Sequence, residues 1–285
     1  MKRIFLFFLT VSLTLSIFGG SATASATNKS QQDINDIKKY VENNVPLLQN
    51  SLSNLPKNSS LDKIEKTISN HFKEHPAPQA FNNPNLSLFD VFPEKKAEYE
   101  KFKGKTLNLN NFIESQEKQE TLGEVISFNN SNSSVKVFLG ELGDIQIVEQ
   151  KTISKSNGSN DATIQLTTKT ERTTGIAYGT TGTKLFTLWA EGKFSYDGKK
   201  VSTVAKDGDY KRHLSGTALL ITVRNLGKDR DASHGGYAYR EVYSRIYVET
   251  IIGFKWAGVV LNSANVEAYV GSTAKGSIYG GTKKS

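Results

Sequence analysis

Residues 184–212 read KLFTLWAEGKFSYDGKKVSTVAKDGDYKR, and this stretch indicates the fold class of the chain. Apolar and polar residues alternate along it with the period of a half-buried β-strand. Asp197-Gly198 and Asp207-Gly208 stand between the runs, and Asp-Gly pairs favour tight hairpin turns. The stretch therefore predicts three antiparallel strands joined by two turns.

The same signals continue on both sides of this stretch, from about residue 122 to the C-terminus. Thr, Val, Tyr and Gly become frequent, and turn residues separate short apolar runs. Roughly ten short strands at this spacing are typical of an antiparallel sandwich or barrel. We therefore expect residues 121–285 to form an antiparallel β-sandwich of about ten strands.

Residues 27–120 show the helical period instead. Apolar residues recur there at steps of three and four, on one face of a helix: Ile34, Ile37, Val41, Val45, Leu48, Leu52 and Leu55. We expect Pro46 to interrupt this helix, because proline has no amide hydrogen to donate. Further helices are predicted at residues 59–75, with Ser59 or Ser60 as N-cap, and at 93–105. The fold class is therefore α+β, with an N-terminal helical region followed by the sandwich.

The N-terminus has the layout of a secretory signal. Lys2 and Arg3 precede an apolar run, and small residues follow it, so residues 1–24 are predicted to be a signal peptide with cleavage after Ala24 or Ala26. No later segment is apolar enough to cross a bilayer. The chain has no cysteine, so disulfides cannot stabilise it. We expect a protein that a Gram-positive bacterium secretes to the extracellular space.

The positive charge is concentrated in the second half. Residues 27–140 carry 14 basic and 14 acidic residues, whereas residues 141–285 carry 20 basic and 14 acidic. Outside a cell, the polyanions available are anionic wall polymers, lipid headgroups and acidic polysaccharides. The positive charge would also suit nucleic acid, but the predicted extracellular location argues against nucleic acid as a partner.

The segment SNHFKEHPAP, residues 69–78, contains His71 and His75 in the H-x-x-E-H spacing of one class of zinc peptidases. A zinc centre needs a third ligand, usually a Glu on a later helix, and little helix is predicted after Lys105. On a helical wheel, His75 falls inside the apolar stripe and His71 at its edge beside Glu74. We therefore interpret both histidines as structural.

No other pattern predicts catalysis. Asp231, Ser233 and His234 are neighbours in one segment, so they cannot take the geometry of a catalytic triad, and this segment is typical of a turn. The acidic pairs Asp207 with Asp209 and Asp229 with Asp231 leave a calcium loop as an alternative to simple turns. We expect no enzymatic activity, no catalytic residue, no bound metal and no cofactor.

The segment GGYAYREVYSRIYVETIIG, residues 235–253, predicts a surface for recognition. On a strand, one face would carry the aromatic and charged side chains Tyr237, Tyr239, Glu241, Tyr243, Arg245, Tyr247 and Glu249. The opposite face would carry the core residues Val242, Ile246, Val248 and Ile252. Tyrosine and arginine suit sugar rings or lipid headgroups, so we expect Tyr237, Tyr239, Tyr243, Arg245 and Tyr247 to bind the bacterial envelope. The alternative is cross-strand tyrosine pairing that only stabilises the sheet.

Residues 147–174 form a second unusual stretch, in which two Ser- and Thr-rich arms flank the turn sequence SNGSND. On the second arm, Ala162, Ile164 and Leu166 alternate with polar residues, as in hairpins that line a membrane pore. Lys151 and Lys155 would be costly in lipid. A membrane-active hairpin and an exposed edge hairpin therefore both remain as interpretations.

The segments TLWAEGKFSYDGKKVSTVAKDGDYKR, residues 187–212, and GFKWAGVVLNSANVEAYVGSTAKGSIYGG, residues 253–281, carry a family resemblance. Through their Trp, Gly and Tyr-Asp-Gly spacing, residues 170–281 resemble the large, unmodified secreted bacteriocins of the geobacillin type. The resemblance implies an exported antibacterial protein that harms related bacteria. It implies no catalytic residue.

These observations predict a secreted, bacteriocin-like antibacterial protein that acts at the envelope of related Gram-positive bacteria. Its partners would be anionic wall polymers or lipids, and the 147–174 hairpin could act in the membrane, where the protein could assemble into an oligomer. The sequence does not identify an immunity partner. The alternative is a non-lethal protein that binds cell-wall or matrix polysaccharide.

Overall fold

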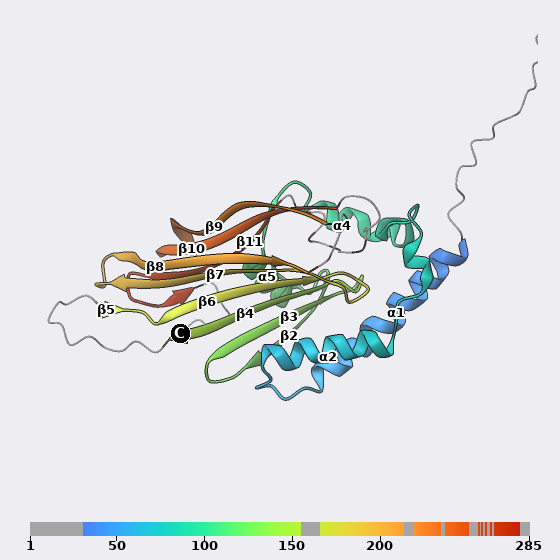
Figure 1. The fold of residues 1–285 in the computed structure, drawn as a ribbon, viewed down its shortest axis with the longest axis horizontal. Coiled ribbons are helices and arrows are strands. Elements are labelled where there is room, and N and C mark those ends of the chain that lie inside the picture. Colours follow the sequence, from blue (N-terminus) through green and yellow to red (C-terminus); the bar gives the residue numbers. More distant parts are fainter. Residues whose placement is uncertain are drawn as a thin grey trace, which may run out of the picture.

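The computed structural model describes residues 31–154, 166–213, 219–234, 237–250 and 265–279, together with Trp256, Gly258, Val260 and Ser263. Within these residues the chain is helical first and strand-rich afterwards, which confirms the predicted change of period (Figure 1). The α-helices are α1 (Gln31–Ser53), α2 (Leu61–Glu74), α3 (Leu88–Val91), α4 (Lys96–Glu100) and α5 (Leu109–Gln119). Short 3₁₀-helices lie at η1 (Gln79–Asn82) and η2 (Pro93–Lys95).

The strands form two sheets. Their bounds are β1 (Thr106–Asn108), β2 (Gly123–Asn129), β3 (Ser133–Gly140), β4 (Ile145–Ser154), β5 (Leu166–Thr167), β6 (Thr170–Tyr178), β7 (Lys184–Tyr196), β8 (Val201–Arg212), β9 (Leu219–His234), β10 (Tyr237–Thr250), β11 (Asn265–Thr273) and β12 (Ile278–Tyr279). The larger sheet has the order β2-β3-β4-β6-β7-β5, with β8 also paired to β7, and its pairs are antiparallel. The smaller sheet has the order β1-β11-β10-β9, with β12 beside β11. Its β1–β11 pair is parallel, and β1 lies before residues 121–285, for which the antiparallel arrangement was predicted.

Helices α1 and α2 cover the outer face of the larger sheet, beside β2 and β3 (Figure 1). The apolar stripes of the two helices pack there on strand residues in one buried cluster: Leu48, Leu52, Ile64, Ile68, Ile126, Phe128, Val135, Val137, Leu139, Ile145, Ile147, Ile176 and Tyr178. Ser60 caps α2 by accepting a hydrogen bond from the Lys63 amide. The apolar face of each helix, which its sequence period predicts, is therefore the face that packs on the sheet.

The two sheets pack on each other through their inner faces. Ala190 and Phe194 of β7 share a buried cluster with Val242 of β10 and Val270 of β11. A larger cluster joins strand residues of both sheets to the chain between η1 and α5. The helical region and the strands thus share one continuous core.

Three local predictions are wrong. Helix α1 runs through Pro46 without ending there, because its buried side chains on the sheet offset the hydrogen bond that proline removes. Asp207-Gly208 is not a turn: β8 stays paired with β7 through Glu191–Asp207 and Ala190–Gly208. By contrast, Asp197-Gly198 does form the β7–β8 turn, with Gly198 at a φ of 89°.

The third wrong prediction concerns the chain after Lys105, where β1 and helix α5 follow directly. The side chain of Asn108 caps α5 by accepting from the Asn111 amide at 3.0 Å. Leu109, Phe112 and Ile113 of α5 are buried in the larger cluster. The short apolar period of this helix was hidden by the polar residues around it.

Candidate functional site

The outer face of the smaller sheet carries four of the predicted recognition residues, Tyr239, Tyr243, Arg245 and Tyr247. In β10, Val242, Ile246 and Val248 are buried in the core, which confirms the predicted division of faces, whereas Ile252 lies outside the described residues. The register places Tyr243 opposite Lys228 of β9 and Tyr269 of β11. Side chains of three strands therefore share this face.

Two arginines and two glutamates form an ion-pair cluster on this outer face. Glu241 and Glu267 are each only 2% exposed. Arg230 forms an ion pair with Glu241 and donates to Glu267 from Nη2 to Oε1 at 2.6 Å. Arg245 donates from Nη2 to Glu267 Oε2 at 2.6 Å. The two positive and two negative charges of this cluster therefore cancel.

The cluster is tied to neighbouring elements. Asn108, the cap of α5, donates to Glu267 Oε1 at 3.1 Å. The Tyr243 ring lies against both guanidinium groups, with the Arg230 carbon 4.1 Å and the Arg245 carbon 5.5 Å from its centroid. Arg245 and Tyr243, both predicted to bind the envelope, therefore already make internal contacts, which lowers their capacity to bind a partner.

Burial changes the acid–base properties of this cluster. It raises the pKa of Glu241, and the Arg230 charge partly offsets the rise. Burial by itself lowers the pKa of Arg230, but its hydrogen bonds and charge interactions with Glu267 and Glu241 outweigh this and raise it. Arg230 therefore stays charged, and the arginine holds the two carboxylates together.

The other tyrosines of β10 differ in their surroundings. Tyr239 is buried, 7% exposed, and its ring lies over Gly271 of β11, where an added Cβ would meet it at 3.0 Å. The backbone of Tyr237 pairs with His234, and its side chain lies outside the described residues. Tyr247 is half-buried, and Arg224 of β9 lies over its ring at 5.1 Å.

Arg224 was missed by the sequence analysis. It is exposed, and it makes no ion pair with any residue of the described ranges. Lys228, on the same face opposite Tyr243, is likewise exposed and without a carboxylate partner among those residues. The pairing of β9 with β10 shifts register near Arg245, so the alternation of β9 could not be extrapolated through Arg224.

The predicted membrane hairpin is described only in its arms. β4 pairs with β6, for example Lys151 with Arg172, and Ala162 and Ile164 lie outside the described residues. Leu166, in β5, pairs through its backbone with Tyr196 of β7 and not with β4. The second arm therefore crosses to β7 before it reaches β6.

The burial of the two histidines of H-x-x-E-H is the reverse of what the helical wheel predicted. His71 is 4% exposed, with its Nε2 2.7 Å from Asn44 Oδ1 of α1, whereas His75 is exposed. Helix α2 ends at Glu74, and His75 adopts a non-helical φ of −122°, so a wheel cannot place it. Burial, and then the neighbouring His75, lower the pKa of His71. His71 is therefore a neutral, buried partner of α1.

The acidic pairs lie on strands. Asp229 forms ion pairs with Lys206 and Arg240, and Arg240 also bonds to Asp231 at 2.9 Å, so this segment belongs to β9 and not to a turn. The side chains of Asp207 and Asp209 accept from the next backbone amides, each at 2.7 Å. Among the described residues, no three Asp, Glu, His or Cys side chains gather as a metal site would require.

Comparison with protein-family models, with curated proteins and with solved structures found no match. Within the described ranges, no helix has the length and apolar character needed to span a bilayer. The assignment of function therefore depends on the surface of the protein itself.

Proposed function

We propose that this protein is secreted and acts against related Gram-positive bacteria by binding anionic polymers or lipids of their envelope. The binding surface is the outer face of β9 and β10, on a pair of sheets that we describe as an open sandwich. Arg224 and Lys228 make the primary contacts, and Tyr247 supports Arg224. The protein needs no catalytic centre for this activity.

One observation carries the proposal: Arg224 is exposed on the Tyr247 ring and makes no ion pair within the described ranges. A guanidinium on an aromatic ring presents its donors in a fixed plane, which suits phosphate or carboxylate groups. Arg230 and Arg245 on the same face are neutralised by Glu241 and Glu267. Among the described residues of this face, the positive charge available to a partner is therefore that of Arg224 and Lys228.

Sedimentation of the mature protein with purified cell wall and with anionic liposomes tests the binding. Arg224→Gln is expected to weaken binding about fivefold, since each basic side chain near an anionic surface contributes roughly 1 kcal/mol. Lys73→Gln is the matched control, because Lys73 is an exposed basic residue on α2, which covers the larger sheet. Equal weakening of binding by both variants would show that binding depends on net charge alone, and it would contradict the proposed binding face.

Killing separates the antibacterial function from the alternative, a non-lethal wall or matrix binder. Micromolar protein is added to a panel of related Gram-positive strains, and colony counts are followed. Loss of viability that Arg224→Gln reduces supports the proposal. Wall binding with unchanged colony counts on every strain would favour the alternative.

Membrane disruption by the 147–174 hairpin is the proposed mode of killing. Ile153, near the end of β4, is 42% exposed, although large apolar side chains are usually covered. Ile164→Asp is expected to abolish the entry of a membrane-impermeant dye into cells, because the apolar face must meet lipid. Thr163→Asp changes the opposite face and is expected to preserve dye entry. Killing without dye entry would exclude the pore.

A further inference from the structure

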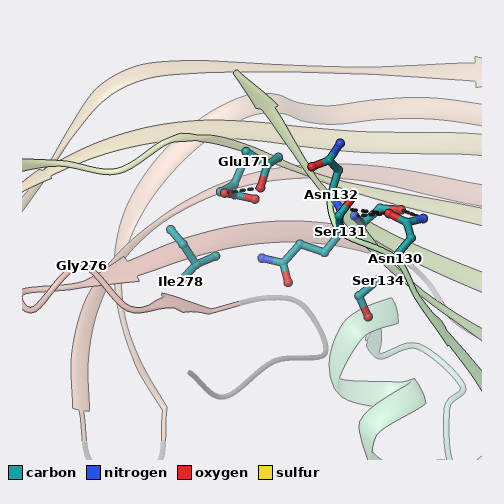
Figure 2. Close-up of a pocket in the computed structure, with 10 residues that line it drawn as sticks. Asn130, Ser131, Asn132, Ser134, Glu171, Gly276 and Ile278 are labelled. Atoms are coloured by element: carbon teal, nitrogen blue, oxygen red, sulfur yellow. Dashed lines mark hydrogen bonds between the residues drawn. The ribbon is translucent and has the colours of Figure 1, made fainter. Parts of the chain in front are cut away.

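A polar pocket opens between the larger sheet and β12 (Figure 2). The proposed contacts Arg224, Lys228 and Tyr247 do not line it, although Gln150, Thr152 and Glu171 of the 147–174 segment do. It encloses about 240 Å³. Its lining comes from the β2–β3 turn, the start of β3, β4, β6 and the segment before and within β12: Asn130, Ser131, Asn132, Ser133, Ser134, Gln150, Thr152, Glu171, Gly276 and Ile278. Figure 2 shows Glu171 and Ile278 on one side and the turn residues on the other.

Glu171 is the single ionisable residue of this lining. It is 8% exposed, and its Oε1 accepts a hydrogen bond from Thr152 Oγ1 at 2.9 Å. Within the described ranges it has no ion-pair partner and no further hydrogen bond, although the Lys169 charge lies near enough to act on it. A nearly buried carboxylate with one neutral partner is energetically costly unless a cation joins it.

The walls beside Glu171 offer further oxygen atoms. The side chains of Asn132 and Gln150 make no hydrogen bond with any described residue. Thr173, directly opposite Gln150 in the β4–β6 pair, is fully buried, and its Oγ1 has no partner in the described part of the chain. Buried hydroxyls are normally satisfied, so this end of the inner face has unused hydrogen-bonding capacity.

The turn that forms the opposite wall is already fixed. Asn130 Oδ1 accepts from the amides of Asn132 at 3.0 Å and Ser133 at 2.8 Å. Asn130 Nδ2 also donates to Ser133 Oγ at 2.9 Å. A ligand therefore meets a preformed wall, and ordering it costs little conformational entropy.

We propose that this pocket binds a small ammonium-bearing molecule, with Glu171 as its counter-charge. An ammonium group has three donors and no acceptor, which suits a carboxylate surrounded by amide and hydroxyl oxygens. A divalent cation would prefer several carboxylates, and the lining has one. The volume suits a single amino sugar or an amino alcohol headgroup rather than a polymer. Burial raises the pKa of Glu171, with Thr152 and then Lys169 partly offsetting the rise, as expected for a carboxylate that forms no ion pair within the described ranges.

Calorimetric titration with two matched pairs of probes tests this site: glucosamine against glucose, and ethanolamine against ethylene glycol. The ammonium member of at least one pair is expected to bind about tenfold or more tightly than its neutral counterpart, since a hydrogen bond to a charged group contributes roughly 1.5–3 kcal/mol. Tighter binding of glucosamine would indicate an amino sugar as the ligand, and tighter binding of ethanolamine would indicate a lipid-type headgroup. Equal binding within both pairs, or no binding of either amine, would overturn the proposal.

Glu171→Gln keeps the shape and removes the charge, so it is expected to weaken amine binding by the same factor of about ten. Glu149→Gln is the matched control. Glu149 is a half-buried carboxylate on β4 whose pKa burial also raises, but it does not line the pocket. Thermal unfolding shows that each variant folds. Unchanged amine binding by Glu171→Gln, or an equal loss in Glu149→Gln, would contradict the assignment.

Discussion

Gly208 of β8 lies directly against Gly227 of β9, where strands from the two sheets meet. A Cβ added to Gly208 would lie 2.5 Å from the Gly227 nitrogen and 2.9 Å from its Cα. The Ser244 hydroxyl would lie closer still, but a side chain can rotate away, whereas the Gly227 backbone cannot. Gly227 itself has a φ of 55°. An ion pair between Lys206 and Asp229 lies beside this contact. The contact therefore decides how closely the sheets approach.

Gly208→Ala is expected to lower the free energy of unfolding by about 2 kcal/mol, because the added methyl forces two backbones apart. Chemical denaturation measures the change. Val204→Thr, at a 53% exposed site of the same strand, should alter stability by less than about 0.5 kcal/mol. An equal effect of both substitutions would mean that the close approach is not a constraint.

Glu267→Gln is expected to destabilise the protein by about 2 kcal/mol, because Arg230 and Arg245 lose the charge that they share. Glu249→Gln, an exposed position on the same face, serves as the control and should have little effect. Urea unfolding of both variants gives the comparison. A neutral Glu267→Gln result would show that the cluster does not contribute to stability.

The lowered pKa of Asp229 predicts that the protein loses stability in acid. Hydrogen bonding by Lys206, with Arg240 adding to it, lowers the pKa of Asp229 from 3.8 to about 2. The folded state thus binds this proton less readily than the unfolded state. The contribution of ionised Asp229 to stability is therefore complete above about pH 4 and is lost between about pH 4 and 2. The unfolding free energy of Asp229→Asn should fall less steeply than that of the parent protein across this range. Parallel curves would exclude the linkage.

His71→Ala is expected to cost about 2 kcal/mol at pH 8, because buried Asn44 loses its 2.7 Å partner. Since the pKa of His71 is lowered from 6.5, the unfolded state takes up this proton more readily, and the parent protein loses stability as the pH falls through about 6.5. The cost of His71→Ala should therefore shrink between pH 8 and 5. Thermal unfolding at the two pH values measures it, with His75→Ala as the exposed control. A pH-independent cost would exclude a neutral, buried His71.

The order of the helical region and the strand-rich region could be predicted because it follows from local periodicity. The stripe of α1 and the alternation of β10 each need only one buried face, so Leu48 and Val242 were correctly placed inside. The turn that contains Asp197-Gly198 was predictable for the same reason, since a short turn between paired neighbouring strands is a local structure.

The environment of the site could not be predicted in this way. Alternation places Arg245 on the outer face but cannot tell whether it meets a carboxylate, and the register shift near Arg245 hides that Arg224 lies on the same face. Glu267 neutralises Arg245 from β11, more than twenty residues away, and nothing in the described structure does the same for Arg224. Charge availability is a property of neighbours across strands.

The sequence by itself determined that the chain is helical first and strand-rich afterwards, and which side of α1 and of β10 is apolar, because these depend on residues close together in the chain. Only the tertiary structure decided that Gly208 meets another backbone instead of turning, that His71 and not His75 is buried, and that Glu171 makes no ion pair with any residue of the described ranges. Each of these depends on contacts between segments distant in the chain, and burial and electrostatic energy are fixed only when those segments meet.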